Sequence, residues 1–168
     1  TNLVVQDGAS LRSQSGVVGV SSRLEIPSVA IRGAGASWET FELVVGQQGR
    51  GIVSLSDGAR MDSSNVLVSK EPGSIGEINV LGVGSVWRNW SSNFLLGPKG
   101  EGRLTIADGG TVISRDVRAA TGLGSRAVIN LTGEGSSWVS EGPVQIGLLG
   151  VSSLEVDNGA IMRAPQVQ

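Results

Sequence analysis

Two aspartates in this chain come nearest to the spacing of a catalytic carboxylate pair. Asp57 and Asp108 each follow a short apolar segment. If equivalent residues stack two strand spacings apart, the carboxylates would lie ~9.6 Å from each other, near the upper separation of an inverting glycosidase. Both are followed by glycine, however, and Asp7-Gly8 and Asn158-Gly159 repeat the pattern. Because Asx-Gly is a turn sequence, we interpret both aspartates as turn residues and expect no catalysis.

Metal and cofactor chemistry finds little support in the composition. The chain of 168 residues contains neither cysteine nor histidine. The usual zinc, copper and haem ligands, a cysteine nucleophile and an imidazole base are therefore missing. A calcium-binding nonapeptide array would need aspartates at consecutive turns in a GGxGxDxUx pattern, which the sequence does not contain. We expect no metal site and no cofactor.

Three tryptophans occur at equivalent places in a long repeat: Trp38, Trp87 and Trp138. A row of indoles about 9.6 Å apart could stack against successive sugars of a glycan. The same indoles could instead close one end of an apolar core. In the intervening segments the equivalent places hold Leu11, Met61, Val112 and Met162. We favour the packing interpretation.

Trp90 lies outside that series, in the longest variable connection, residues 88–93. An aromatic residue off the repeat and flanked by Arg88 and Asn89 is a candidate contact residue, because loops on a rigid scaffold often carry binding residues. Burial of Trp90 beneath its own loop is the alternative. We predict a binding site formed by Trp90, Arg88 and Asn89.

These residues are set within a repeat of nearly constant length. Seven apolar pairs with i, i+2 spacing recur along the chain, as expected of short strands with one face turned inward. Successive copies are separated by 26, 24, 25, 26, 25 and 25 residues. The second members of the pairs are Val5, Ile31, Leu55, Val80, Ile106, Leu131 and Val156. A period of ~25 residues built on strands and turns is typical of a β-solenoid.

The turn residues show that alternate copies differ. Two positions after the second member of each apolar pair, the chain has Asp7, Gly33, Asp57, Gly82, Asp108, Gly133 and Asn158. Acidic or amide residues thus alternate with glycine, and both tolerate the positive φ of a sharp turn. We infer a repeating unit of two coils, which divides one β-helix domain at about 1–51, 52–102, 103–150 and a partial unit at 151–168. The predicted fold is all-β, a parallel β-helix of about seven coils of ~25 residues.

The composition agrees with this fold class. Glycine accounts for 26 residues and is periodic, while the hydrophobic fraction of 39% is enough to form a core. These values exclude a disordered chain, and the lack of a three-residue glycine period excludes collagen. Basic and acidic residues number 13 and 15, and no basic stripe with interleaved aromatic residues suggests nucleic acid. No apolar run is long enough to cross a bilayer, so we expect no membrane insertion of this segment.

The compound pattern resembles one protein family. The strings GEGSSW, VQIG and LLGPKGEGRLTIADGGTVIS are similar to repeats in the passenger regions of bacterial autotransporters, the type V secreted surface adhesins. The resemblance covers essentially the whole chain. The first double coil departs from it, because Leu24-Glu25-Ile26 and Pro27 stand where later coils have Gly-Ser.

The resemblance implies a right-handed, single-stranded β-helix on the Gram-negative cell surface or released from it, outer-membrane associated and acting in adhesion, autoaggregation, biofilm formation or virulence. Implied partners are a host or bacterial surface glycan or protein, or a second copy of the chain. The chain would then be a piece of a longer passenger whose C-terminal translocator β-barrel lies elsewhere in the parent protein.

Two other classes use the same scaffold. A β-helical polysaccharide lyase or glycosidase would carry long insertions that build a cleft and a non-repeating charged cluster. A phage tail-spike segment would form an obligate trimer. The near-constant coil length favours a structural and adhesive module without catalysis.

Overall fold

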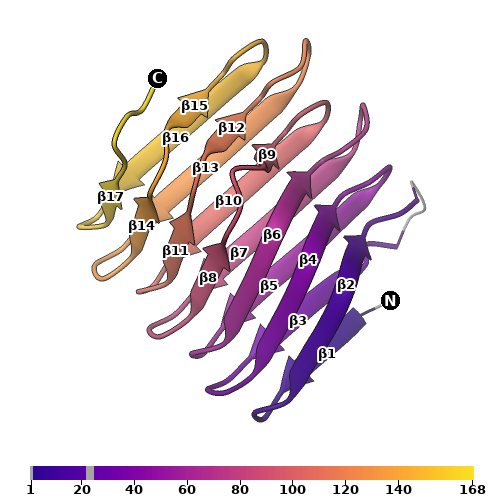
Figure 1. The fold of residues 1–168 in the computed structure, drawn as a ribbon, viewed down its shortest axis with the longest axis vertical. Helices are drawn as coiled ribbons and strands as arrows, with labels where there is room; N and C mark the ends of the chain where they lie inside the picture. Colours follow the sequence, from indigo (N-terminus) through magenta and orange to yellow (C-terminus); the bar gives the residue numbers. More distant parts are fainter. Residues whose placement is uncertain (1, 22–24) are drawn as a thin grey trace.

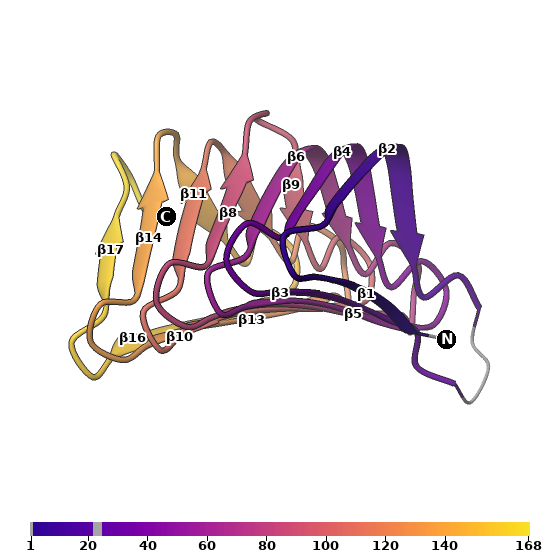
Figure 2. The ribbon, with the colours of Figure 1, turned by 90° about the horizontal axis from the view of Figure 1, so that it is seen from below.

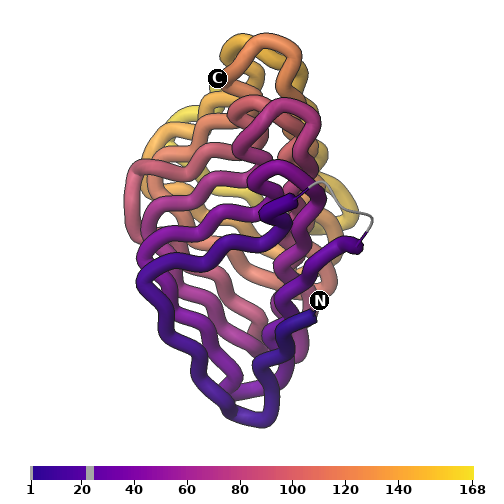
Figure 3. The backbone as a smooth tube through the Cα atoms, turned by 90° about the vertical axis from the view of Figure 1, so that its right-hand side faces the viewer, coloured from indigo at the N-terminus to yellow at the C-terminus, as the bar shows by residue number. Residues whose placement is uncertain are grey.

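The computed structural model describes residues 2–21 and 25–168, and Leu24 of the irregular first double coil lies outside these ranges. The described chain is all-β and winds as a parallel β-solenoid, with one coil for about every 25 residues. Figure 1 shows the strands stacked side by side in two layers, and Figure 3 shows the backbone advancing coil by coil from the N-terminus to the C-terminus. The predicted fold class is confirmed.

The first sheet contains one strand from each of seven coils, all parallel. Its strands in order are β1 (Asn2–Gln6), β3 (Ser28–Arg32), β5 (Arg50–Ser56), β7 (Ile75–Leu81), β10 (Glu101–Ala107), β13 (Arg126–Thr132) and β16 (Val151–Asp157). The predicted apolar column is present in register: Val5 pairs with Ile31, Ile31 with Leu55, and so on to Val156. Figure 2 shows this sheet as one broad, gently curved layer facing the strands of the second sheet.

The second sheet changes its construction along the solenoid. The first three coils each contribute one long strand: β2 (Ser10–Val18), β4 (Ser37–Val45) and β6 (Arg60–Val68). The next three coils split this side into two short strands each: β8 (Val86–Asn89) and β9 (Phe94–Leu96), β11 (Thr111–Ser114) and β12 (Val117–Ala119), and β14 (Ser137–Ser140) and β15 (Val144–Ile146). The last coil contributes the single strand β17 (Ile161–Arg163). Strand β6 pairs with both β8 and β9, so the sheet branches at the fourth coil.

The turns between the sheets have the predicted chemistry. Asp57 has a φ of 59° and Asp108 a φ of 55°, and each is followed by a glycine with positive φ. The Ala59 N–H donates to the Ser56 carbonyl at 3.2 Å, which closes a turn with two positive φ values. In the next coil Gly82 takes the place of the aspartate, with a φ of 85°. The alternation of Asx and glycine therefore satisfies one left-handed backbone position in every coil.

The repeated tryptophans are part of the core. Trp38 pairs in register with Leu11 and Met61, and Trp87 and Trp138 continue the same column. All three are buried, and Trp87 packs edge-on against the equally buried Phe94 with ring centroids 5.1 Å apart. The packing interpretation is confirmed, and these indoles are not available to a ligand.

A column of polar side chains runs through the core wall beside the tryptophans. It lies two residues further along each strand and consists of Ser13, Thr40, Ser63, Asn89, Ser114 and Ser140. Each indole N–H donates to a serine of the preceding coil, as Trp87 does to Ser63 at 2.9 Å and Trp138 to Ser114 at 2.9 Å. A buried indole needs such a partner, which explains the hydroxyl groups of Ser13, Ser63 and Ser114 inside an otherwise apolar wall.

Close backbone approach and charge pairing stabilise the first sheet and its turns. Gly76 has no room for a side chain, because an added Cβ would meet the Val45 carbonyl oxygen and the Cγ1 of Val68. On the outer face, Glu77 accepts hydrogen bonds from Arg50 at 2.6 Å and Arg103 at 3.4 Å. Glu77 therefore links its coil to the coils on both sides.

Candidate functional site

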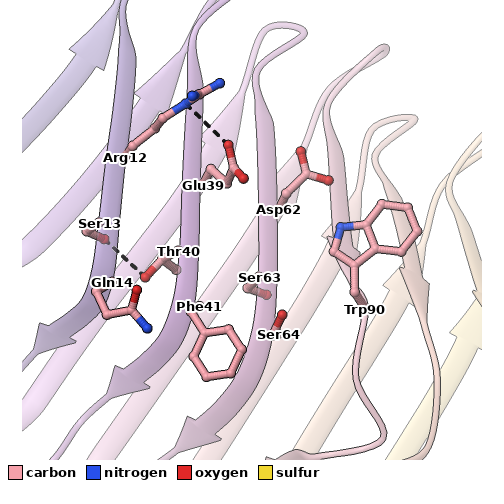
Figure 4. Close-up of a pocket in the computed structure, with 10 residues that line it drawn as sticks. All are labelled: Arg12, Ser13, Gln14, Glu39, Thr40, Phe41, Asp62, Ser63, Ser64 and Trp90. Carbon is pink, nitrogen blue, oxygen red and sulfur yellow. Dashed lines mark hydrogen bonds and ion pairs between the residues drawn. The ribbon is translucent and has the colours of Figure 1, made fainter.

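A shallow groove of about 420 Å³ lies on the outer face of β2, β4 and β6. Figure 4 shows its floor on the three strands and Trp90 at one side. Its lining is polar except for two aromatic rings: Arg12, Ser13, Gln14, Glu39, Thr40, Phe41, Asp62, Ser63, Ser64 and Trp90. The groove ends where the long strands of the first three coils give way to the split strands of the fourth.

Trp90 stands at this boundary because its coil is wider than its neighbours. Ser63 pairs with Asn89 and Val66 with Phe94, so residues 90–93 occupy the place of Ser64 and Asn65 in the preceding coil. The extra length is accommodated outward, since the flanking residues keep their register with the core. Such a local widening presents a side chain without disturbing the stack.

The widened loop is held by hydrogen bonds to the coil before it. The Trp90 N–H donates to the Ser63 carbonyl at 2.9 Å, and the Ser91 hydroxyl donates to the Ser64 carbonyl at 2.8 Å. The Asn93 N–H in turn donates to the Ser91 hydroxyl at 3.2 Å. The Trp90 main chain is therefore fixed level with Ser64, which pre-organises its side chain.

The structure separates the three predicted binding residues. Trp90 is 49% exposed, so it is not buried beneath its own loop. The Arg88 guanidinium carbon lies 5.8 Å from the centre of the Trp90 ring, within cation–π range. The partly buried Arg88 and the exposed Trp90 ring thus form one unit at the end of the groove.

Asn89 belongs to the core wall and not to this unit. It is only 2% exposed and its amide donates to the Ser64 carbonyl, while its Oδ1 atom has no hydrogen-bond partner within the described chain. The connection also starts later than residue 88, because β8 continues through Asn89. Arg88 and Asn89 are strand residues, and alternation along the strand turns Asn89 inward.

Phe41 is the groove residue that the sequence did not reveal. Its ring is 53% exposed on β4, one residue after Thr40 of the polar column, as Trp90 is one residue after Asn89. Phe41 and Glu42 are both exposed in succession, so the alternation of buried and exposed residues along β4 is interrupted here. A prediction that assumes strict alternation cannot assign a face to a residue at such an interruption. The available signal was that Phe41 and Trp90 each follow the polar residue two places after a core tryptophan.

The charges of the groove are largely paired. The Arg12 guanidinium lies 3.3 Å from the Glu39 carboxylate, and Arg60 donates to Asp62 at 2.6 Å. The hydrogen bond from Arg60 to Asp62 raises the pKa of Arg60 above its ordinary value, so its guanidinium stays charged. Glu39 on β4 and Asp62 on β6 are neighbours in the backbone register of the two strands, so their carboxylates lie side by side on the floor of the groove.

The other chemical candidates of the sequence lie in structural positions. Asp57 and Asp108 occupy left-handed turn positions, as described above. Within residues 2–21 and 25–168, no group of three or more acidic, histidine or cysteine side chains is arranged to hold a metal ion. The same part of the chain contains no helix that could span a membrane.

Comparison with protein-family models, curated proteins and solved structures gave no match to this chain.

Proposed function

We propose that this chain is a structural and adhesive β-helical segment of a bacterial autotransporter passenger, displayed on the cell surface or secreted, and that it has no catalytic role. The observation that carries the proposal is the half-exposed Trp90, held on a fixed widening of an otherwise regular solenoid. A rigid array presents such a contact residue at a defined height and at low entropic cost. Adhesion or autoaggregation would use this surface.

Regular coils support a contact function without a deep pocket. The coils keep a spacing of about 25 residues, and the groove is a shallow hollow on a sheet face. Weak contacts of this kind gain strength when many copies are displayed together, because linked sites bind with a high effective concentration. Surface display of many passengers would supply that multivalency.

The alternative is a polysaccharide-processing enzyme, and one observation favours it. Glu39 and Asp62 are paired neighbours on the groove floor, and two carboxylates are the catalytic groups of most glycosidases. Against this alternative, each carboxylate is held by a guanidinium, Glu39 by Arg12 and Asp62 by Arg60. An ion-paired carboxylate keeps lone pairs that accept hydrogen bonds from sugar hydroxyls, but a nucleophile or general acid has to reach the anomeric carbon or the glycosidic oxygen. We therefore favour binding over catalysis.

The test is a binding array of glycans and matrix proteins, probed with the purified wild-type chain and with Trp90→Ala. We expect at least one ligand bound by the wild type and lost by the variant. Val83→Ala, which truncates an apolar side chain that is 84% exposed on a distant turn, is the matched control and should bind as the wild type does. Ligands bound equally by all three proteins would contradict the proposed contact site.

The enzymatic alternative and the location are tested separately. Release of reducing ends from any bound polysaccharide, lost in Glu39→Gln or Asp62→Asn, would contradict the non-catalytic role. Antibodies against the purified chain should stain intact cells of the organism that produces it. Staining only after the cells are permeabilised would contradict surface display.

A further inference from the structure

Two exposed aromatic rings occupy the same corner of the solenoid, two coils apart. Phe41 follows Thr40, and Trp90 follows Asn89, in the coils on either side of the Ser63-Ser64 corner. Strand stacking places the two backbone positions about two spacings, ~9.6 Å, from each other. Both rings are about half exposed, and both line the groove in Figure 4. The two backbone positions therefore lie on a line parallel to the solenoid axis, and in Figure 4 the Phe41 ring points toward the C-terminal ends of the strands while the Trp90 ring points the other way.

The floor between the rings presents hydrogen-bonding groups. Ser64 lies in the coil between Phe41 and Trp90, and the carboxylates of Glu39 and Asp62 lie beside it. A pyranose ring has an apolar face of C–H groups and a rim of hydroxyl groups. Aromatic rings fit the first, while carboxylate and hydroxyl oxygens accept hydrogen bonds from the second. The groove thus combines both kinds of contact that a sugar chain requires.

We propose that this groove binds a neutral polysaccharide that lies along the solenoid axis, with sugars stacked on Phe41 and Trp90. The direction follows from the backbone positions of the two aromatic residues, which lie in different coils and not along one strand. The separation of about two strand spacings is comparable to the length of a disaccharide unit, so both rings can engage one chain. This inference rests on the proposed function and assigns the ligand class of the same site.

Charge decides between neutral and acidic glycans. Both carboxylates of the lining are ion-paired, Glu39 with Arg12 and Asp62 with Arg60. A third guanidinium, that of Arg88, lies over the Trp90 ring. A sulfate or uronate on the groove floor would have to compete with Glu39 and Asp62 for these guanidiniums, and it would be repelled by the carboxylate it displaces. A neutral chain meets no such penalty, because its hydroxyl groups donate to the carboxylates.

Trp90 provides its own binding signal. The other three tryptophans are buried and their indole N–H groups are hydrogen bonded within the core. Iodide should therefore quench mainly the fluorescence of Trp90, and a bound sugar should protect it. The probes are neutral β-1,4-glucan and N-acetylglucosamine oligomers of increasing length, with heparin as the acidic comparison.

The expected result is protection that grows with oligomer length and is absent with the monosaccharides. Phe41→Ala keeps the reporter and should weaken binding of the longest oligomers about tenfold, the loss expected from one stacking surface. Val83→Ala should leave both affinity and quenching unchanged. If Phe41→Ala unfolds, which its circular dichroism would reveal, Phe41→Leu keeps the bulk without the ring and serves in its place.

The outcomes separate this inference from the proposed function. Protection by heparin alone, or equal affinity in Phe41→Ala and the wild type, would overturn the neutral glycan. Trp90-dependent binding to a matrix protein without any protection by sugars would also overturn it, while leaving the adhesive function in place. Ligand binding that is the same in Trp90→Ala and in the wild type would overturn both the neutral-glycan inference and the proposed contact site.

Discussion

The buried pair of Trp138 and Ser114 offers a sharp test of the packing scheme. The Ser114 hydroxyl accepts from the Trp138 indole at 2.9 Å and donates to Ser140 at 3.3 Å, and both members of the pair are fully buried. In Ser114→Ala, Ser140 keeps the Arg115 and Gly142 carbonyls as acceptors at 2.7 and 3.0 Å. The indole N–H alone loses its partner.

A buried donor left without a partner costs about 1–3 kcal/mol, and we expect Ser114→Ala to lower the free energy of unfolding by that amount. The matched control is Ser13→Ala, the equivalent residue beneath Trp38 in the first coil. Ser13 is only partly buried, so water can replace its hydroxyl and the loss should stay below about 1 kcal/mol.

Urea unfolding followed by far-ultraviolet circular dichroism gives both values, because that signal does not depend on the indoles themselves. A double-mutant cycle that combines Ser114→Ala with Trp138→Phe should show a coupling free energy of about 0.5–1.5 kcal/mol between Ser114 and Trp138. Equal losses in the two serine variants, or no coupling between Ser114 and Trp138, would refute the claim that Ser114 stabilises the fold by accepting from the buried indole.

Three further predictions concern the stack itself. Leu104→Asp places an unpaired charge in the core and should cost more than about 4 kcal/mol in urea unfolding, whereas exposed Arg118→Asp should change stability by less than about 0.5 kcal/mol; similar losses would contradict the assigned faces. Gly76→Ala should cost about 3 kcal/mol by overpacking, while Gly73→Ala, with open space but a φ of 77°, should cost about 1 kcal/mol of backbone strain. If thermal melts showed Gly73→Ala to be less stable than Gly76→Ala, they would refute the close contact of Gly76 with Val45 and Val68. Glu77→Gln should lose about 0.5–1 kcal/mol, and the loss should shrink at ~1 M salt as the ion pairs are screened; a salt-independent loss would argue against the charge network.

The repeat could be predicted from the sequence because every coil has to satisfy the same physical demands. Parallel stacking places like residues above one another, so the apolar column from Val5 to Val156 is visible as a period. Turns with positive φ admit few residue types, which fixes the meaning of Asp57 and Gly82. The burial of the three repeated tryptophans followed from the same regularity.

The site was harder to predict because it lies where the regularity is interrupted. Trp90 stood out as the aromatic residue off the repeat. Phe41 did not, since Phe41 and Glu42 are exposed in succession and so break the alternation that assigns residues to faces. Asn89 was assigned to a loop, although the strand includes it and turns its side chain inward. The serine partners of the indoles were visible in principle, two residues after Leu11, Met61 and Val112.

Distances between spin labels test the central claim, that the coils stack in register along one axis. The chain contains no cysteine, so pairs of introduced cysteines carry the labels without interference. With one label at Glu155, partners at Asn79, Ser54 and Val4 lie three, four and six coils away in the same outward column. Pulsed electron paramagnetic resonance should give distances that rise by about 4.8 Å per coil, to ~14, ~19 and ~29 Å. Distances that do not increase with the number of intervening coils would contradict the solenoid and the groove built on it.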